Sequence, residues 1–362
     1  MSFARTRPYN DLPMLPPSGV ELETRAVLKQ AIAANRALAQ LKGSGDLLPN
    51  HSVLVRVIGL QEAKLSSEIE NIVTTNDELY RAFSEEISRA SDPHTKEVLS
   101  YNDALWYGYN RLTEGRPLAT RLFAEIAQII KQSHLDIRTT TGTQIQNSAT
   151  GEAIYTPPEG ESVVRNKLSN LEDFLHAKDD LDPLVKMAIL HYQFEAIHPF
   201  TDGNGRTGRI LNILYLIHAG LLDIPVLYLS RYIIAHKSDY YAGLRQVTEN
   251  SAWEEWILFL LRAVESTATE TYERIQAIRV LMQETTETVR ASLPRIYSKD
   301  LIEVLFAQPY CKIKFLEDAG LGHRQTASKY LHELAGIGVL KPLSAGRERY
   351  FLNTAFLDLL AR

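Results

Sequence analysis

The segment at residues 198–209 combines side chains that remove protons with a backbone that can bind phosphate. It reads His198-Pro-Phe-Thr-Asp-Gly-Asn-Gly-Arg-Thr-Gly-Arg209 and lies between two apolar segments of helical character. Gly203 and Gly205 allow backbone torsions that other residues avoid, so successive amide N–H groups can turn toward one anion. The next helix is expected to begin near Gly205, which adds the positive end of its dipole. The spacing predicts a phosphate-binding nest.

Charged side chains surround this nest. Arg206 and Arg209 are three residues apart, on one helical face, and two guanidinium groups there would hold a polyphosphate. Asp202 offers a hard oxygen ligand to Mg²⁺, which usually takes one or two carboxylates together with substrate phosphates. His198 could take the proton of an attacking hydroxyl. A bare Asp-Gly-Asn-Gly is commonly only a turn, but these neighbours favour an enzyme that transfers part of a nucleoside triphosphate to a hydroxyl group.

Composition narrows the class of protein. The chain has 362 residues, 45% hydrophobic and 23% charged, which is typical of a globular protein of two or three domains. A net charge of −5 argues against a general nucleic-acid binder. The single cysteine, Cys311, and an N-terminus without an apolar signal region predict a cytoplasmic protein. Apolar runs such as residues 210–222 are too short and too polar to span a membrane, so no membrane partner is expected.

The hydrophobic periodicity predicts a mainly α-helical fold, preceded by an extended, proline-rich arm over residues 1–20. Helices are predicted over residues 21–41, 53–70, 77–89, 94–113, 118–132, 163–177, 184–197, 205–219, 237–249 and 252–280 or beyond. Thr, Ser and Gly replace this pattern between residues 138 and 156, which predicts a β-hairpin with its turn near residues 149–151. Pro157 and Pro158 end it, because proline cannot donate to a β-ladder.

After Pro294 the predicted elements become shorter. Three short helices are predicted over residues 298–308, 312–320 and 323–336, followed by two strands around residues 339–343 and 349–352, and this order indicates a winged-helix domain. Residues 295–362 hold ten Lys or Arg against seven Asp or Glu. This net charge of +3 is modest for DNA binding, in which phosphate contacts dominate. A protein-contact role is therefore favoured slightly over DNA, which stays open as a partner.

The segment at 198–209 resembles the motif of the Fic family at every defining position. The resemblance extends from about Pro49 to Ala263 and includes Tyr155-Thr-Pro-Pro158 and residues 189–197. It implies a Fic-type helical bundle with a β-hairpin flap, here joined to the winged-helix domain. The domains expected are an N-terminal arm and helical region (1–110), a Fic catalytic domain (111–275), a helical linker (276–294) and the winged helix (295–362).

The resemblance also implies an activity, because most Fic proteins are protein adenylyltransferases that move AMP from ATP to a Ser, Thr or Tyr hydroxyl of a protein. His198 would be the base and Asp202 the Mg²⁺ ligand. Arg206 and Arg209 would hold the β- and γ-phosphates, and a tyrosine pair would flank the adenine and ribose. The implied nucleotide-binding residues are Asp202, Gly203, Asn204, Gly205, Arg206, Thr207, Gly208, Arg209, Tyr240 and Tyr241.

Two further segments gain a meaning from the resemblance. The strand Ile154-Tyr155-Thr156 would be the flap that aligns a target segment by adding it to a strand edge. Ser66-Ser-Glu-Ile-Glu70-Asn71 matches the Fic inhibitory motif, in which Glu70 would pair with Arg209 and occupy the space of the γ-phosphate. Ser66 and Glu70 share one helix face. From the residues alone, this segment is a solvated polar helix end.

Several alternatives remain open at this point. The chain could be a DNA-binding regulator whose Fic domain senses a nucleotide, although a pure sensor would not need His198. It could transfer another group, such as UMP or phosphocholine, or remove AMP with Glu70 positioning a water. It could also be an interaction protein with a vestigial cleft. The partners expected are a protein bearing a hydroxyl side chain, the chain itself as a target of self-modification, and a second copy in a homodimer.

Overall fold

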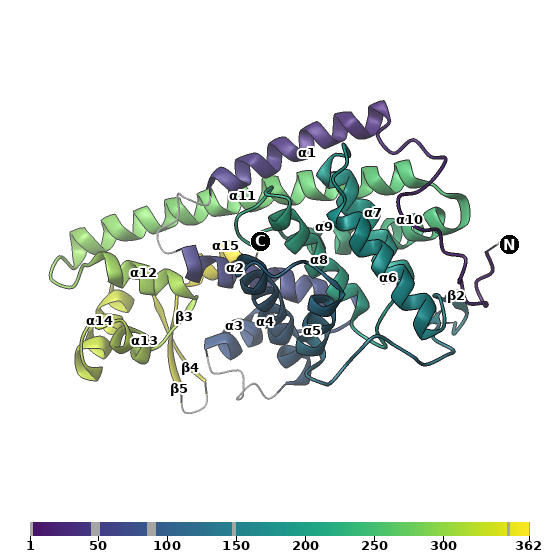
Figure 1. Ribbon diagram of the computed structural model, residues 1–362. Coiled ribbons are helices and arrows are strands. Elements are labelled where there is room, and N and C mark those ends of the chain that lie inside the picture. The colour runs from purple at the N-terminus through teal and green to yellow at the C-terminus, as the bar shows by residue number, and fades with distance from the viewer. Residues whose placement is uncertain (1–2, 45–50, 85–91, 147–149, 346–347, 362) are drawn as a thin grey trace.

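The computed structural model describes residues 3–44, 51–84, 92–146, 150–345 and 348–361. This part of the chain is mainly helical, with one two-stranded and one three-stranded sheet (Figure 1). No helix within it is long and apolar enough to cross a membrane. The helices before the C-terminal domain are α1 (Arg25–Ser44), α2 (His51–Ile69), α3 (Asn76–Ser84), α4 (Pro93–Thr113), α5 (Thr120–Lys131), α6 (Glu161–His176), α7 (Pro183–Ile197), α8 (Asn204–His218), α9 (Leu229–Ala235), α10 (Lys237–Asn250) and α11 (Trp253–Ser292).

Helices α7 and α8 form the centre of the part of the molecule that precedes the C-terminal domain. Asp182 caps α7 by accepting the Leu184 N–H at 2.8 Å, and Pro183 occupies the first turn, where its missing N–H costs nothing. Nearly all of α7 is buried, so its sides contact other helices all round. The helix ends at His198, whose left-handed φ of 50° turns the chain into the loop before α8. Dense packing therefore fixes both ends of the predicted motif.

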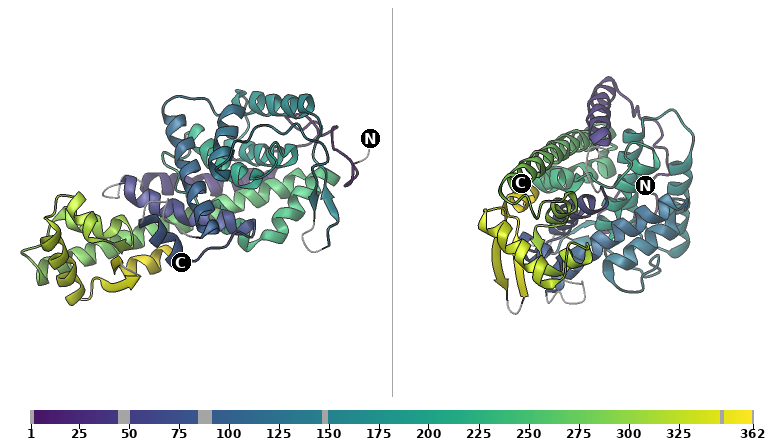
Figure 2. Two further views of the ribbon diagram at one scale, coloured as in Figure 1. Left: turned by 90° about the horizontal axis from the view of Figure 1, so that it is seen from below. Right: turned by 90° about the vertical axis from the view of Figure 1, so that its left-hand side faces the viewer.

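A single long helix connects the two halves of the molecule. Helix α11 runs for 40 residues, with α1 packed along it (Figure 1). It continues unbroken through residues 276–292, most of the predicted linker. The C-terminal domain therefore lies at one end of the molecule and the flap at the other (Figure 2).

The C-terminal domain shows the predicted order of three helices and a hairpin. Its elements are α12 (Lys299–Ala307), β3 (Tyr310–Cys311), α13 (Ile313–Asp318), α14 (Arg324–Gly336), β4 (Lys341–Ala345), β5 (Glu348–Leu352) and α15 (Thr354–Ala361). The sheet has the order β3-β5-β4, so a third strand joins the predicted pair. Strand β3 was not predicted because two residues are too few to show a period. The Tyr310 hydroxyl of β3 donates to Asp77 of α3, joining this domain to the helices that precede it.

The predicted hairpin is present and short. Strand β1 (Ile145–Gln146) pairs antiparallel with β2 (Ala153–Tyr155), with Ile145 opposite Tyr155. Ala149, in the predicted turn, lies outside the described residues. The N-terminal arm reaches this hairpin, since the Tyr9 N–H donates to the Thr156 carbonyl at 3.0 Å. The arm thus packs against the flap rather than only covering the surface.

Candidate active site

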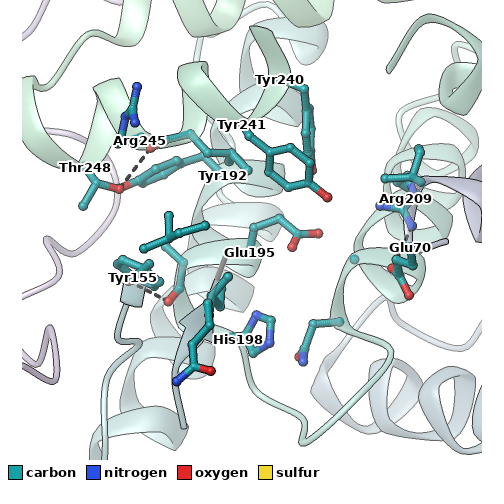
Figure 3. Close-up of a pocket in the computed structure, with 18 of the residues that line it drawn as sticks. Glu70, Tyr155, Tyr192, Glu195, His198, Arg209, Tyr240, Tyr241, Arg245 and Thr248 are labelled. Atoms are coloured by element: carbon teal, nitrogen blue, oxygen red, sulfur yellow. Dashed lines mark hydrogen bonds and ion pairs between the residues drawn. The ribbon is translucent and has the colours of Figure 1, made fainter. Parts of the chain in front are cut away.

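A cavity of about 600 Å³ opens between the flap, α7, the start of α8 and α10 (Figure 3). Its size suits a nucleotide-sized ligand. Most of the predicted site residues line it, namely Glu70, Ile154, Tyr155, His198, Asp202, Gly203, Asn204, Gly205, Arg209, Tyr240 and Tyr241. The predicted residues that do not line it are Ser66, Thr156, Arg206, Thr207 and Gly208.

His198 is the C-cap of α7 and is only partly exposed to the cavity. The backbone N–H of His198 donates to the Phe194 carbonyl at 3.0 Å, which holds the backbone at the turn. Burial, and then the positive charge of Arg138, lower the pKa of His198 to about 4. The imidazole is therefore neutral at physiological pH, the state in which it can accept a proton.

Arg138 is a buried residue that sequence reasoning missed. Its Nε donates to the His198 carbonyl at 2.7 Å and its Nη2 to the Ile197 carbonyl at 3.1 Å. Nη2 also donates to the Pro158 carbonyl, and the Arg138 N–H donates to the Pro199 carbonyl at 2.9 Å. One side chain thus caps the negative end of α7 and ties the base of the flap to the histidine loop.

Replacing Arg138 by alanine is expected to shift the pH dependence of catalysis. Losing the positive charge raises the pKa of His198, so the rate should start to fall at a higher pH on acidification than in the parent. Arg138→Lys keeps the charge but cannot reach all the carbonyls, so it should lose rate without that pH shift. The rate of the AMP transfer that the family resemblance implies, measured between pH 4 and 8, tests this on samples whose thermal unfolding shows a folded protein. Superimposable pH profiles for alanine and parent would contradict it.

The loop before α8 has the backbone of an anion nest. Gly203 is its N-cap, with φ of 76°, a torsion that favours glycine. Asn204 was expected to steady the phosphates, but its side chain closes the loop. Its Oδ1 accepts the Phe200 N–H at 2.8 Å and its Nδ2 donates to the Phe200 carbonyl at 2.8 Å. Asn204 therefore acts on the shape of the nest from behind.

Asp202 sits at the mouth of the cavity with its side chain 55% exposed. Lys131 of α5 approaches its Oδ2 at 2.6 Å and also contacts Glu97 Oε1 at 2.9 Å. Burial opposes the charge of Asp202, but the ammonium group of Lys131 outweighs it and lowers the carboxyl pKa. A cation binding at Asp202 would displace Lys131, which Glu97 could still hold. Lys131 and Glu97 are outside every motif, and no sequence signal marked them.

Glu70, just beyond the end of α2, reaches both arginines. Its Oε1 lies 2.8 Å from Arg209 Nη2, and its Oε2 lies 2.7 Å from Arg206 Nε. Arg209 also donates from Nε to Ser66 Oγ at 2.7 Å and from Nη2 to the Ser66 carbonyl at 2.9 Å. Burial by itself disfavours the charge of Arg209, and the Glu70 carboxylate outweighs it and raises the guanidinium pKa.

Three residues of the predicted nucleotide loop lie behind the cavity wall. Arg206 has 1% of its side chain exposed and pairs with Glu70 and Glu97. Thr207 is fully buried. Gly208 makes room for a neighbouring helix, because a β-carbon there would lie 2.5 Å from Glu195 Oε1. In this conformation their contacts are with protein.

The two tyrosines differ in exposure. Tyr240 is buried, and its hydroxyl lies 2.9 Å from His191 Nε2 on α7. Tyr241 is 48% exposed and packs edge-on against Tyr240, with ring centroids 5.2 Å apart. Tyr240 is therefore fixed in the wall, and Tyr241 offers a ring to a flat ligand in the cavity (Figure 3).

The flap residues also differ in their exposure to the cavity. Ile154 is 38% exposed on the cavity rim. The Tyr155 hydroxyl donates to the Ala196 carbonyl at 2.8 Å, and its ring stacks on Phe3 of the arm at 5.9 Å. Thr156 is buried, with Oγ1 donating to the Arg5 carbonyl at 2.6 Å. The arm therefore covers Thr156, which sequence reasoning had placed among the docking residues.

Comparison with known proteins matches this chain to three family models in succession. Residues 28–110 match the Fic/DOC family N-terminal model, residues 117–216 the Fic/DOC family model, and residues 281–356 the C-terminal domain of SoFic-like protein adenylyltransferases. A Fic family protein from Desulfovibrio desulfuricans has the same fold, with a TM-score of 0.58 over 91% of this chain and 96% of that one, at 19% identity.

Curated relatives are similar over a shorter stretch. The protein adenylyltransferase Fic of Nematostella vectensis is 34% identical over 115 residues, which are 31% of this chain and 25% of that protein. A probable protein adenylyltransferase of Aquifex aeolicus is 40% identical over 83 residues, 23% of this chain and 26% of that protein. The chain thus spans about a quarter of the length of these relatives. The motif, the fold and the three successive models show that this chain belongs to the Fic/DOC family.

Proposed function

We propose that this protein transfers AMP from ATP to a hydroxyl group of a protein. One observation carries the proposal: a single cavity joins a neutral histidine, the N-terminal nest of α8, a buried arginine and an aromatic ring. The relatives named as protein adenylyltransferases support the same reaction.

The chemistry follows from the positions of the groups. The target hydroxyl oxygen attacks the α-phosphorus as the His198 imidazole takes its proton. The new bond joins that oxygen to phosphorus, and the bond to the bridging oxygen breaks, so pyrophosphate leaves with the electron pair. The nest at Gly203 and Gly205 and the guanidinium of Arg209 stabilise the phosphate charges. Placing the reactants correctly accounts for much of the acceleration.

The donor set beside the nest fits Mg²⁺. Asp202 is an accessible carboxylate next to the expected phosphates, which is how Mg²⁺ is usually bound with a nucleotide. When bound, the metal would neutralise phosphate charge. Lys131 would then give up its ion pair with Asp202 and keep the one with Glu97, so its ammonium group would remain paired.

We further propose that Glu70 restrains the enzyme. Its carboxylate pairs with Arg209, the arginine that lines the cavity, and also with Arg206 behind the wall. Gly205 permits this approach, because a β-carbon there would lie 2.7 Å from Glu70 Oε1. ATP phosphates and Glu70 therefore compete for Arg209, and a productive pose requires Glu70 to move away.

Labelled ATP tests the proposed reaction. The Glu70→Gly protein is incubated with Mg²⁺ and a cell lysate, using ATP labelled at either the α- or the γ-phosphate. Label from the α-phosphate should stay on protein, including the enzyme itself, and γ-label should not. A chelator should abolish the transfer. Retention of γ-label, or labelling only from a uridine or choline nucleotide, would replace this reaction with another. No label from any donor would reject it.

A further inference from the structure

Glu195 is a cavity residue to which neither the motif nor the reaction assigns a role. It lies on α7, four residues after His191 and three before His198, so the three side chains share one face of the helix. His191 contacts Tyr240 at the aromatic end of the cavity, and His198 faces the phosphate nest. With a helical rise of about 1.5 Å per residue, Glu195 lies about 6 Å along the axis from His191, and His198 follows just beyond the end of the helix.

The carboxyl group of Glu195 points into the cavity between Tyr241 and the Glu70–Arg209 pair (Figure 3). Its Oε1 is buried and has no hydrogen-bond partner among the described residues. A buried polar atom without a partner is costly, so such atoms are rare unless a ligand or water completes them. Burial raises the pKa of this carboxyl to about 7, with the Arg209 charge opposing the rise.

The packing of α8 against α7 leaves room for this carboxyl group. Gly208 on the facing helix would carry a β-carbon only 2.5 Å from Glu195 Oε1, so the missing side chain is what admits the carboxyl. Glycine inside a helix lowers the stability of that helix relative to alanine. Gly208 lies inside α8, so its presence there is a cost that the room for the carboxyl group explains. Both observations indicate a positioned acceptor on the cavity side of α7.

We propose that Glu195 accepts hydrogen bonds from the ribose hydroxyls of the nucleotide and so selects ribonucleotides over deoxyribonucleotides. The inference rests on the proposed nucleotide site. A nucleotide with phosphates at the nest and its base beside Tyr241 must place its sugar between them, where Glu195 lies. A carboxyl oxygen complements a vicinal diol, as acidic side chains do in dinucleotide sites. Phosphate would be repelled by the same group, which favours the sugar as its partner.

Nucleotide binding tests this assignment without requiring turnover. Calorimetry on the Glu70→Gly chain is carried out with ATP, 2′-deoxy-ATP and 3′-deoxy-ATP. A hydrogen bond to a charged group predicts that the parent prefers ATP over at least one deoxynucleotide by roughly ten- to a hundredfold. In Glu195→Gln and Glu195→Ala that preference should shrink to about twofold or less, because ATP alone loses affinity.

Two matched variants sharpen the comparison. Gly208→Ala keeps the carboxylate but displaces it, so it should also erode the preference for ATP. Glu161→Gln removes a carboxylate from the first turn of α6, outside the cavity, and should keep the full preference.

The outcomes separate this inference from the proposed reaction. Selective ATP binding without AMP transfer would reject the reaction and keep the sugar contact. Equal weakening of all three nucleotides by the Glu195 variants would overturn the sugar contact while AMP transfer stood. If the Glu195 variants lost affinity for ATP and both deoxynucleotides but not for inosine triphosphate, Glu195 would contact the base. That result would also overturn the sugar contact. Failure of ATP to bind the parent would reject both.

Discussion

Replacing Glu70 by glycine is expected to raise AMP transfer about ten- to a thousandfold. A minor conformation is typically populated at roughly 0.1–10%, and the rate rises by this factor if the active conformation changes from minor to predominant. The substitution removes the carboxylate from Arg209 and Arg206, at 2.8 and 2.7 Å. The guanidinium group of Arg209, which lines the cavity, then becomes available to ATP phosphates, while Arg206 stays paired with Glu97 behind the wall. Transfer of α-phosphate label at saturating ATP and Mg²⁺ measures the effect.

A neighbouring glutamate provides the control for this experiment. Glu68 lies in the last turn of α2, two residues before Glu70, and pairs with Lys64 at 3.3 Å, away from the arginines. Glu68→Gly therefore places a glycine in the same segment without freeing Arg209, and its activity should stay near that of the parent. If Glu70→Gly is no more active than Glu68→Gly, Glu70 does not restrain the enzyme.

Removing the imidazole of His198 is expected to lower AMP transfer in the Glu70→Gly chain by about 100- to 10,000-fold, the usual contribution of a general base. Its burial beside Arg138 keeps it unprotonated, so a proton acceptor is lost across the physiological pH range. ATP affinity should change little, because the phosphates are held by the nest and by Arg209. Single-turnover transfer rates and ATP binding by calorimetry distinguish these two effects.

An exposed histidine gives the matched substitution. His134, outside the cavity, can be replaced by alanine with little expected effect on either measurement. Transfer by His198→Ala within about threefold of the parent would show that proton removal does not depend on His198. That result would favour the alternative in which the domain senses a nucleotide.

Much of the fold could be predicted from local pattern. Apolar residues at helical spacing located α7 and α8, because each helix must bury a face, and Asp182-Pro183 marked the start of α7. Strand β3 and helix α9 were missed, since two and seven residues carry too little periodicity. Helix α11 continues unbroken to Ser292, which agrees with the prediction of a helix over residues 252–280 or beyond.

From spacing alone, the site was predictable only where its residues are contiguous, whereas Glu70, Tyr240 and Tyr241, which also line the cavity, were named from the family resemblance. His198, Asp202 and the glycines lie in one segment, so their spacing alone indicated a phosphate site. Arg138 and Glu195 were not found. Arg138 lies in a segment without periodicity and acts through carbonyl groups, which leave no mark on sequence. Glu195 did carry a signal, as one of the few ionisable residues in an otherwise apolar helix, at helical spacing from two histidines.

The chemically active groups can be read from the amino-acid sequence: a proton acceptor, a glycine nest, two arginines and a glutamate four residues after Ser66. Their surroundings depend on how the helices pack. The tertiary structure buried Arg206 behind the wall and turned Asn204 back onto Phe200. It also brought Glu70 against Arg209 across 139 positions of the chain. The physical reason is that burial and pairing of charges depend on which helices pack together, and packing joins residues whose separation along the chain carries no period.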